Sequence, residues 1–281
     1  MRLRSIGFVR RGEGRIMRSW FRAATQWLNS VRPGIMSPFR DAGLLPDASS
    51  VTSSPLNWAD MINDQVMPHV RRQMQIPWSA VTGGSSEDFD QDHDSIAYLD
   101  DAHNRMVRTP DEVYAQINTI IHRGIDEGLS IPDIADDVAT VLDANRSEQW
   151  RNRAMVVART ETIGATNAGA FYGAADLARE RQDPNPEKVW IATIGDDRTR
   201  ATHIIADKQR VPLFSPFIVG GFPLMFPGDP AGPPQEVIQC RCSMLDVVAG
   251  EEIDWTDREF LDNDPWADSE DWSAPEFRLG D

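Results

Sequence analysis

The chain has 281 residues, of which 41% are hydrophobic, and its formal net charge is −16. This is long enough for one large domain or two smaller ones with packed cores, which excludes a disordered chain. No run of 18 apolar residues and no apolar stretch of secretory length is present, so we expect a soluble protein without a membrane span or signal peptide. The two cysteines, one residue apart, exclude a disulfide framework and suit a reducing compartment.

The charge is distributed unevenly along the chain. Residues 1–40 hold nine arginines and a single acid, Glu13, and so sum to +8, which leaves −24 for the other 241 residues. Residues 250–281 form an acidic tail with tryptophans spaced among prolines. We interpret this tail as solvated, and docking of its tryptophans on a partner is the alternative.

Within the basic end, apolar residues recur at helical spacing and arginines fall mostly on the other side of the wheel. This predicts an amphipathic helix that ends at Pro33, Gly34 and Pro38, followed by a linker to residue 56. Such a helix suits a partner groove, a nucleic-acid backbone or an anionic membrane surface. The expected partner-binding residues are Trp20, Trp27, Arg15, Arg18 and Arg22.

We expect residues 57–108 to contact a partner and to include an acidic, flexible, turn-prone stretch near 83–90. Thr109 followed by Pro110 and Glu112 then has the pattern of a helix start with a threonine N-cap and a capping box. Ser130 starts a second helix in the same way. A DNA-binding helix-turn-helix is a less favoured interpretation of this pair, because acids occupy the second helix where such a unit carries basic or amide side chains.

A third helix is predicted from about Ser147 to Arg181. Its apolar face includes Trp150, small residues and Glu161. A carboxylate on that face needs an arginine or amide partner if it is buried. The alanines and glycines around it predict close backbone approach by whatever packs on this helix.

After Pro184 the pattern changes from helical to extended. Residues 189–194, 210–213 and 243–248 predict a small antiparallel sheet. Residues 215–234 contain so many prolines and glycines that we expect a long loop or flap without regular structure. The predicted fold class is therefore α+β, with a helical N-terminal and middle region followed by a small sheet with a long Pro/Gly-rich loop.

Four motifs in this part of the chain are specific in combination: "ARTETIGATNAGA", "KVWIATIGDDRTRATH", "FPGDPAGPP" and "IQCRC". In this order and at these distances they resemble the phage Mu F-like head morphogenesis family, the minor head proteins of tailed bacteriophages. The resemblance covers about residues 109–249, with helices over 109–182 and a small sheet over 188–249. The chain departs from the family pattern at Gln239, where asparagine is common, and at Asp207-Lys208-Gln209, where an Asp-Gly turn often occurs.

The resemblance implies a virion component rather than an enzyme. It implies a few copies per particle, incorporated into the procapsid near the portal and assisting head assembly or DNA packaging and ejection. The expected partners are the portal protein and the major capsid protein, with packaged DNA as a further possibility through the basic N-terminus. The expected location is the head interior or portal vertex of the virion, and the host cytoplasm during assembly.

The motifs "DDRTRATH" and "QCRC" raise three hypotheses about chemistry, and we expect them to lie side by side in the fold. The favoured one is a structural polar network of Glu161, Asp196, Asp197, Arg198, Arg200 and His203. The second is a structural zinc site with His203, Cys240 and Cys242 as ligands. Apart from such a zinc ion, we expect the chain to bind no cofactor. The third is a metal-dependent hydrolase or transferase using Glu161, His203 and the cysteine pair; the zinc deaminase signature is absent because the cysteines are one residue too close.

Overall fold

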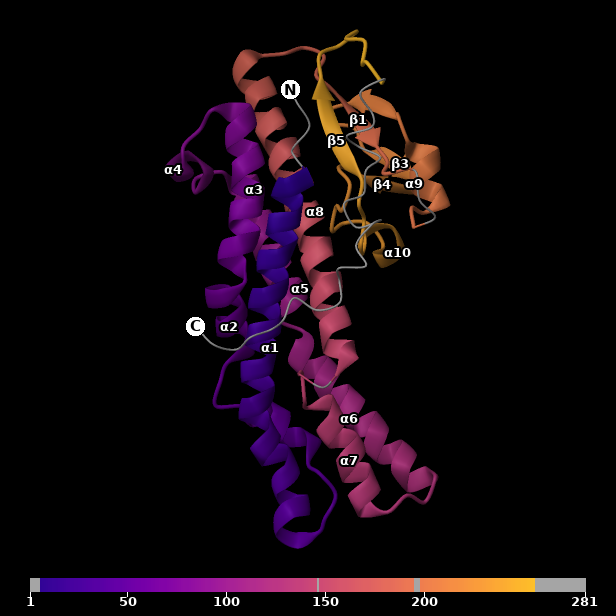
Figure 1. The fold of residues 1–281 in the computed structure, drawn as a ribbon. Helices are drawn as coiled ribbons and strands as arrows, with labels where there is room; N and C mark the ends of the chain where they lie inside the picture. The colour runs from indigo at the N-terminus through magenta and orange to yellow at the C-terminus, as the bar shows by residue number, and fades with distance from the viewer. Residues whose placement is uncertain (1–5, 146, 195–197, 256–281) are drawn as a thin grey trace.

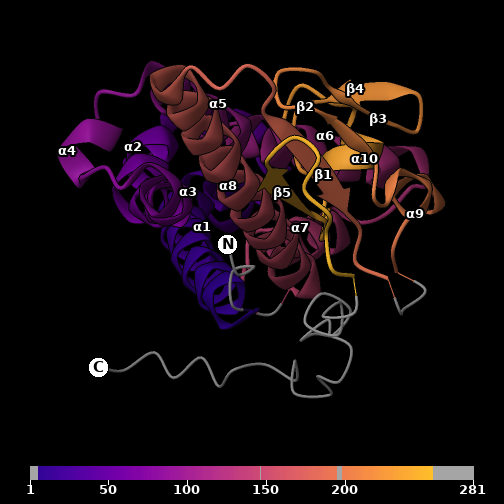
Figure 2. The same ribbon diagram turned by 90° about the horizontal axis from the view of Figure 1, so that it is seen from above.

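Three long helices run side by side through the structure (Figure 1): α1 (Ile6–Ala42), α3 (Met67–Thr82) and α8 (Glu148–Arg181). The computed structural model describes residues 6–145, 147–194 and 198–255. Seen from above, α8 lies between the other two long helices and a small β region (Figure 2). The predicted α+β class is confirmed.

Helix α1 does not stop at its prolines, so the predicted helix end is wrong. A proline inside a helix lacks the N–H that would reach the carbonyl four residues earlier. For Pro38 that carbonyl belongs to Gly34, and the Ser37 hydroxyl donates to it instead at 3.1 Å. Val31 and Ile35 are also buried on this stretch, so packing holds the helix together. Residues 48–53, expected as linker, form a short 3₁₀ helix whose Val51 is buried.

The tryptophans of α1 lie in the core of this chain. Trp20 stacks on Trp150 of α8 with ring centroids 5.9 Å apart, and Trp27 lies 5.6 Å from Trp58 of α2 (Trp58–Gln65). Both α1 tryptophans are about 1% exposed or less. The expectation that they bind a partner is therefore wrong for this structure, because the apolar face of α1 is already covered by its own chain.

The small residues of α8 allow α3 to approach its backbone directly. A Cβ added at Gly169 would lie 2.1 Å from the carbonyl oxygen of Met74, and one at Gly173 would lie 3.1 Å from that of Trp78. Only glycine fits the first position without a shift of the α3 backbone. The predicted close approach to this helix is thus confirmed.

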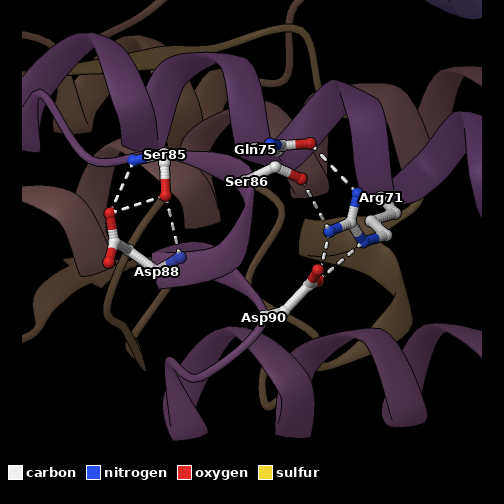
Figure 3. Close-up of polar contacts among 6 residues, drawn as sticks. All are labelled: Arg71, Gln75, Ser85, Ser86, Asp88 and Asp90. Carbon is white, nitrogen blue, oxygen red and sulfur yellow. Dashed lines mark hydrogen bonds and ion pairs between the residues drawn. The ribbon is translucent and has the colours of Figure 1, made fainter.

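The acidic stretch after α3 is ordered by its own side chains (Figure 3). Ser85 and Asp88 form a capping box at the start of α4 (Ser86–Phe89), which lowers the pKa of Asp88 through hydrogen bonds from Ser85. Arg71 of α3 reaches across to Asp90 and to the Ser86 hydroxyl. The acids therefore fix the turn between α3 and α5 (His93–Met106).

The two middle helices are where the sequence places them: α6 (Thr109–Asp126) and α7 (Ile131–Val141) form a hairpin that projects at one end of the molecule (Figure 1). Ser130 caps α7 as predicted. Thr109 does not cap α6, because Arg108 before it has helical backbone angles and the Thr109 hydroxyl bonds the Met106 carbonyl instead. The sequence thus gives the position of α6 but not its cap.

The β region consists of a three-stranded antiparallel sheet and a separate hairpin. In the sheet, β1 (Glu187–Ile191) lies between β2 (Arg210–Pro212) and β5 (Ser243–Val247), with Ile191 opposite Ser243. These three strands correspond to the predicted ones. Residues 215–234, expected to lack regular structure, contain the hairpin of β3 (Phe217–Val219) and β4 (Phe222–Leu224). The short helix α10 (Pro234–Val237) begins where that segment ends.

Among the helices described by the structure, none is both long enough and apolar enough to span a bilayer.

Candidate functional site

His203 lies on the short helix α9 (Ala201–Ala206), and Cys240 and Cys242 lie on the segment between α10 and β5. The pairing of β1 with β5 brings this segment back beside the end of β1, from which the chain proceeds to α9. All three side chains are about 1% exposed. The prediction that the two motifs lie side by side is confirmed.

The donor atoms of these three residues converge on a small volume. The Nδ1 atom of His203 is 3.3 Å from the sulfur of Cys242 and 3.7 Å from that of Cys240. All three donor atoms lie within 4.8 Å of one another. Among the described residues they form a cluster whose spacing could accommodate a metal ion.

A carboxylate fixes the far side of the histidine ring. The Nε2 atom of His203 is 3.0 Å from Oε2 of Glu236 on α10, and the Thr202 hydroxyl donates to the same oxygen at 2.8 Å. Because a carboxylate accepts, a proton belongs on Nε2, and in the neutral ring the lone pair of Nδ1 faces the sulfurs. The ring is further held edge-on to Trp190, at 5.5 Å between centroids. Glu236 was not predicted, because nothing in its local sequence marks it as a histidine partner.

The two thiols have opposite electrostatic tendencies. A hydrogen bond from Cys242, and then His203, holds the pKa of Cys240 well below its usual range despite its burial. Burial and the adjacent Cys240 raise the pKa of Cys242. Burial alone would lower the pKa of His203, but the hydrogen bond and charge of Cys240, with Glu236, raise it. These directions favour a Cys240 thiolate beside a protonated His203, because each charge stabilises the other.

Further contacts tie the two motifs together around this cluster. Arg200, the residue before α9, donates to the Ile238 carbonyl, and Arg241 donates to the Thr199 hydroxyl at 2.9 Å. Arg198 is exposed. Asp196 and Asp197, expected in the polar network, lie outside the described residues.

Glu161 is a buried acid with an arginine partner, but the partner is not one of the predicted network. Its two oxygens accept from Nε and Nη2 of Arg105 on α5, at 3.2 and 2.8 Å. The guanidinium also lies 5.6 Å from the ring centre of Tyr98, and burial followed by the charge of Glu161 raises the pKa of Tyr98. The predicted joining of Glu161 to the arginines of "DDRTRATH" is therefore corrected: this ion pair connects α5 to α8.

Lys188 on β1 is a buried cation that the sequence did not single out. Its side chain is fully buried; Nζ donates to the Met225 carbonyl at 2.7 Å and lies 4.6 and 5.0 Å from the ring centres of Phe171 and Phe217. Burial lowers the pKa of Lys188 to about 7, opposed only in part by Asp229. This contact fixes the Pro-Gly-Asp-Pro loop over the sheet.

The predicted arginines of α1 do form a surface feature. We define the arginine patch as the following residues of α1 and α3: Arg11, Arg15, Arg18, Arg22 and Arg72. Arg15 is half-buried and the other four are exposed. Burial and three neighbouring arginines lower the pKa of Arg15, and burial with four of these arginines lowers that of His69. In the described part of the chain no ion pair is formed by a member of the patch, and a hollow of about 430 Å³ lies along its α1 side.

Comparison with known proteins agrees with the resemblance of the motifs. Residues 115–245, just under half of the chain, match the family model described as Phage Mu protein F like protein. This match includes α8, most of the sheet and the His203 cluster. It is a family of head morphogenesis proteins and not a known enzyme family, and it suggests capsid-related partners and a location in the virion. No curated protein and no solved structure matches the chain.

Proposed function

From the Mu F-like match over residues 115–245, we propose that this chain is a minor head protein of a tailed bacteriophage. It is incorporated into the procapsid near the portal and assists head assembly, DNA packaging or ejection. The family match is the observation that carries this proposal. The burial of His203 and the cysteines supports a structural role, because a substrate could not reach them without rearrangement of α9 or α10.

The arginine patch supplies the surface by which the protein would be held in the head. Its members on α1 are spaced by three or four residues, so they follow one face of the helix over about 16 Å. With no carboxylate of the described chain paired to them, these guanidinium groups suit carboxylates of a partner. We favour an acidic surface of the portal or capsid protein over DNA, because the strongly acidic remainder of the chain would repel an extended polyanion.

The test is to count copies in purified heads by quantitative mass spectrometry. A phage lacking this protein would be complemented with the wild type, with a triple variant Arg11→Glu, Arg18→Glu and Arg22→Glu, or with the control Arg108→Glu. Arg108 is also exposed but lies outside the patch, before α6. Absence of the wild type from heads would refute the head-protein assignment itself.

The expected result is normal incorporation of the wild type and the control and at least tenfold loss of the triple variant. Copies should already be present in procapsids that contain no DNA, since the proposed partner is a protein. Normal incorporation of the triple variant would refute the role of the patch, and incorporation only after DNA packaging would assign the patch to DNA.

A further inference from the structure

The cluster of His203, Cys240 and Cys242 has the composition and spacing of a zinc site. In tetrahedral Zn²⁺ sites the Zn–S and Zn–N distances are about 2.3 and 2.0–2.1 Å, which places neighbouring donor atoms roughly 3.4–3.8 Å apart. The two His203–sulfur distances, 3.3 and 3.7 Å, lie within or about 0.1 Å from this range. We propose that these three side chains bind one Zn²⁺.

The hydrogen-bonding capacity of the cluster supports this proposal. With its proton on Nε2, the His203 ring offers a single lone pair at Nδ1, and the sulfurs of both cysteines converge on it. Without a metal, one thiol can donate to that lone pair and Cys242 can donate to the sulfur of Cys240, so only weak thiol hydrogen bonds hold the three groups together. A soft divalent cation at the convergence point engages all three donors at once, and the two thiolates balance its charge.

The surroundings of His203 match those of metal-bound histidines. Such histidines almost always donate their other ring nitrogen to a carboxylate or carbonyl, which fixes the tautomer and orients the ligand. Glu236 fills this place, and Thr202 holds Glu236 in turn. Gly220 leaves room for the carboxylate, because a Cβ there would lie 2.5 Å from Oε1 of Glu236.

The proposed ion joins α9 to the segment that leads into β5, so its role is to hold together two parts of the chain more than thirty residues apart. The short helix α9 has six residues and no side-chain N-cap, and it cannot be stable by itself. A metal that binds only the folded chain adds to the free energy of unfolding by mass action.

The first experiment measures the zinc content of the full-length protein, purified without a metal-binding tag from zinc-supplemented cells and dialysed. We expect about one zinc per chain by plasma mass spectrometry. The variants Cys242→Ser and His203→Ala should retain less than a tenth of this. The control His122→Ala, at an exposed histidine of α6, should retain all of it.

The second experiment identifies the ligands and does not depend on ligand variants that might fail to fold. Cobalt substitution should give thiolate-to-metal charge-transfer absorption, and zinc-edge X-ray absorption should show two sulfur neighbours. Glu236→Gln keeps all three ligands, and we expect its zinc affinity to fall 10- to 100-fold. Added chelator should lower the unfolding temperature of the wild type.

A wild-type chain that is purified without zinc, and that binds neither added zinc nor cobalt, would overturn the proposal. The proposal would also be overturned if wild type and Cys242→Ser retained zinc equally, or if X-ray absorption showed no sulfur among the zinc ligands. In either case the metal would be held elsewhere. None of these outcomes depends on the location of the protein in a phage head.

Discussion

Replacement of Gly169 by alanine tests the packing of α3 on α8. In an exposed helix interior this change stabilises by about 1 kcal/mol, because alanine has the higher helix propensity. Here the new Cβ would lie 2.1 Å from the Met74 carbonyl oxygen, so the α3 backbone must move by about 1 Å to reach ordinary contact. Overpacking of this kind typically costs about 1–3 kcal/mol and more when backbone must move. We expect a net loss of about 1–3 kcal/mol.

The matched control is Gly14→Ala in the N-terminal third of α1. A Cβ there meets only the end of the flexible Arg18 side chain, at 3.2 Å, which can move aside. This variant should therefore gain about 0.5–1 kcal/mol from helix propensity. Both free energies of unfolding can be measured by urea denaturation monitored by circular dichroism, at unchanged slope. Gly169→Ala equal to or more stable than wild type would refute the close contact of the two helices.

Three further substitutions test individual interactions by the same denaturation assay. Glu161→Gln should lower the free energy of unfolding by about 1–3 kcal/mol, because Arg105 keeps its charge and loses its carboxylate partner. The control Glu180→Gln, at an exposed site on the same helix, should change it little. Equal stability of the two variants would contradict the buried ion pair. Burial lowers the pKa of Lys188 to about 7, so between pH 7 and about 10.5 the unfolded chain binds more protons than the folded chain. The free energy of unfolding of the wild type, relative to that of Lys188→Met, should therefore rise with pH across that window. A difference that does not change with pH would show that the lysine titrates normally. Lys208 has a left-handed backbone (φ 62°), so Lys208→Gly should be more stable than Lys208→Ala by about 1 kcal/mol. Both variants lose the contact of Lys208 with Trp255, so that contact does not affect the comparison. The reverse order of stability would exclude backbone strain at this turn.

The elements that the sequence predicts well are those whose signals are local. The apolar spacing and length of α8, the Ser130 cap and the extended runs of the sheet all depend on residues close together in the chain.

The errors concern elements that are decided by contacts distant in sequence. Helix α1 continues through Pro33 because its next turns pack on other segments, and packing outweighs a proline penalty of about 3 kcal/mol. The hairpin of β3 and β4 has strands of three residues, too short for a periodic signal. The amide of Gln209 bonds both the N–H and the carbonyl of Ile218 and so acts as an additional pairing edge. No local pattern encodes that contact.

The same distinction applies to the candidate site. The cluster of His203, Cys240 and Cys242 could be predicted because a histidine and two closely spaced cysteines are typical metal ligands, and the pairing of β1 with β5 brings them together. Two contacts could not be predicted: that of Glu236 with His203 and that of Arg105 with Glu161. The chain has 28 basic and 44 acidic residues, and the sequence alone does not say which of them pair. The helical spacing of the apolar residues of α1 predicts its apolar face, but the sequence analysis assigned Trp20 and Trp27 to a partner, whereas the structure shows that their own chain covers them.

This cover leads to a last prediction, about the removal of residues 1–40. Trp20 and Trp27 are each worth at least about 2 kcal/mol by burial, and Glu13 pairs with Arg159 of α8. Arg159 also donates to the side chain of Gln239, the residue before Cys240. Helix α8 therefore connects α1 to the cluster of His203, Cys240 and Cys242. The truncated chain should therefore lose cooperative unfolding and bind a hydrophobic dye, and its absence from heads would reflect misfolding and not lost attachment. A fragment 41–281 that unfolds cooperatively at the wild-type midpoint would show instead that α1 is a separable anchor.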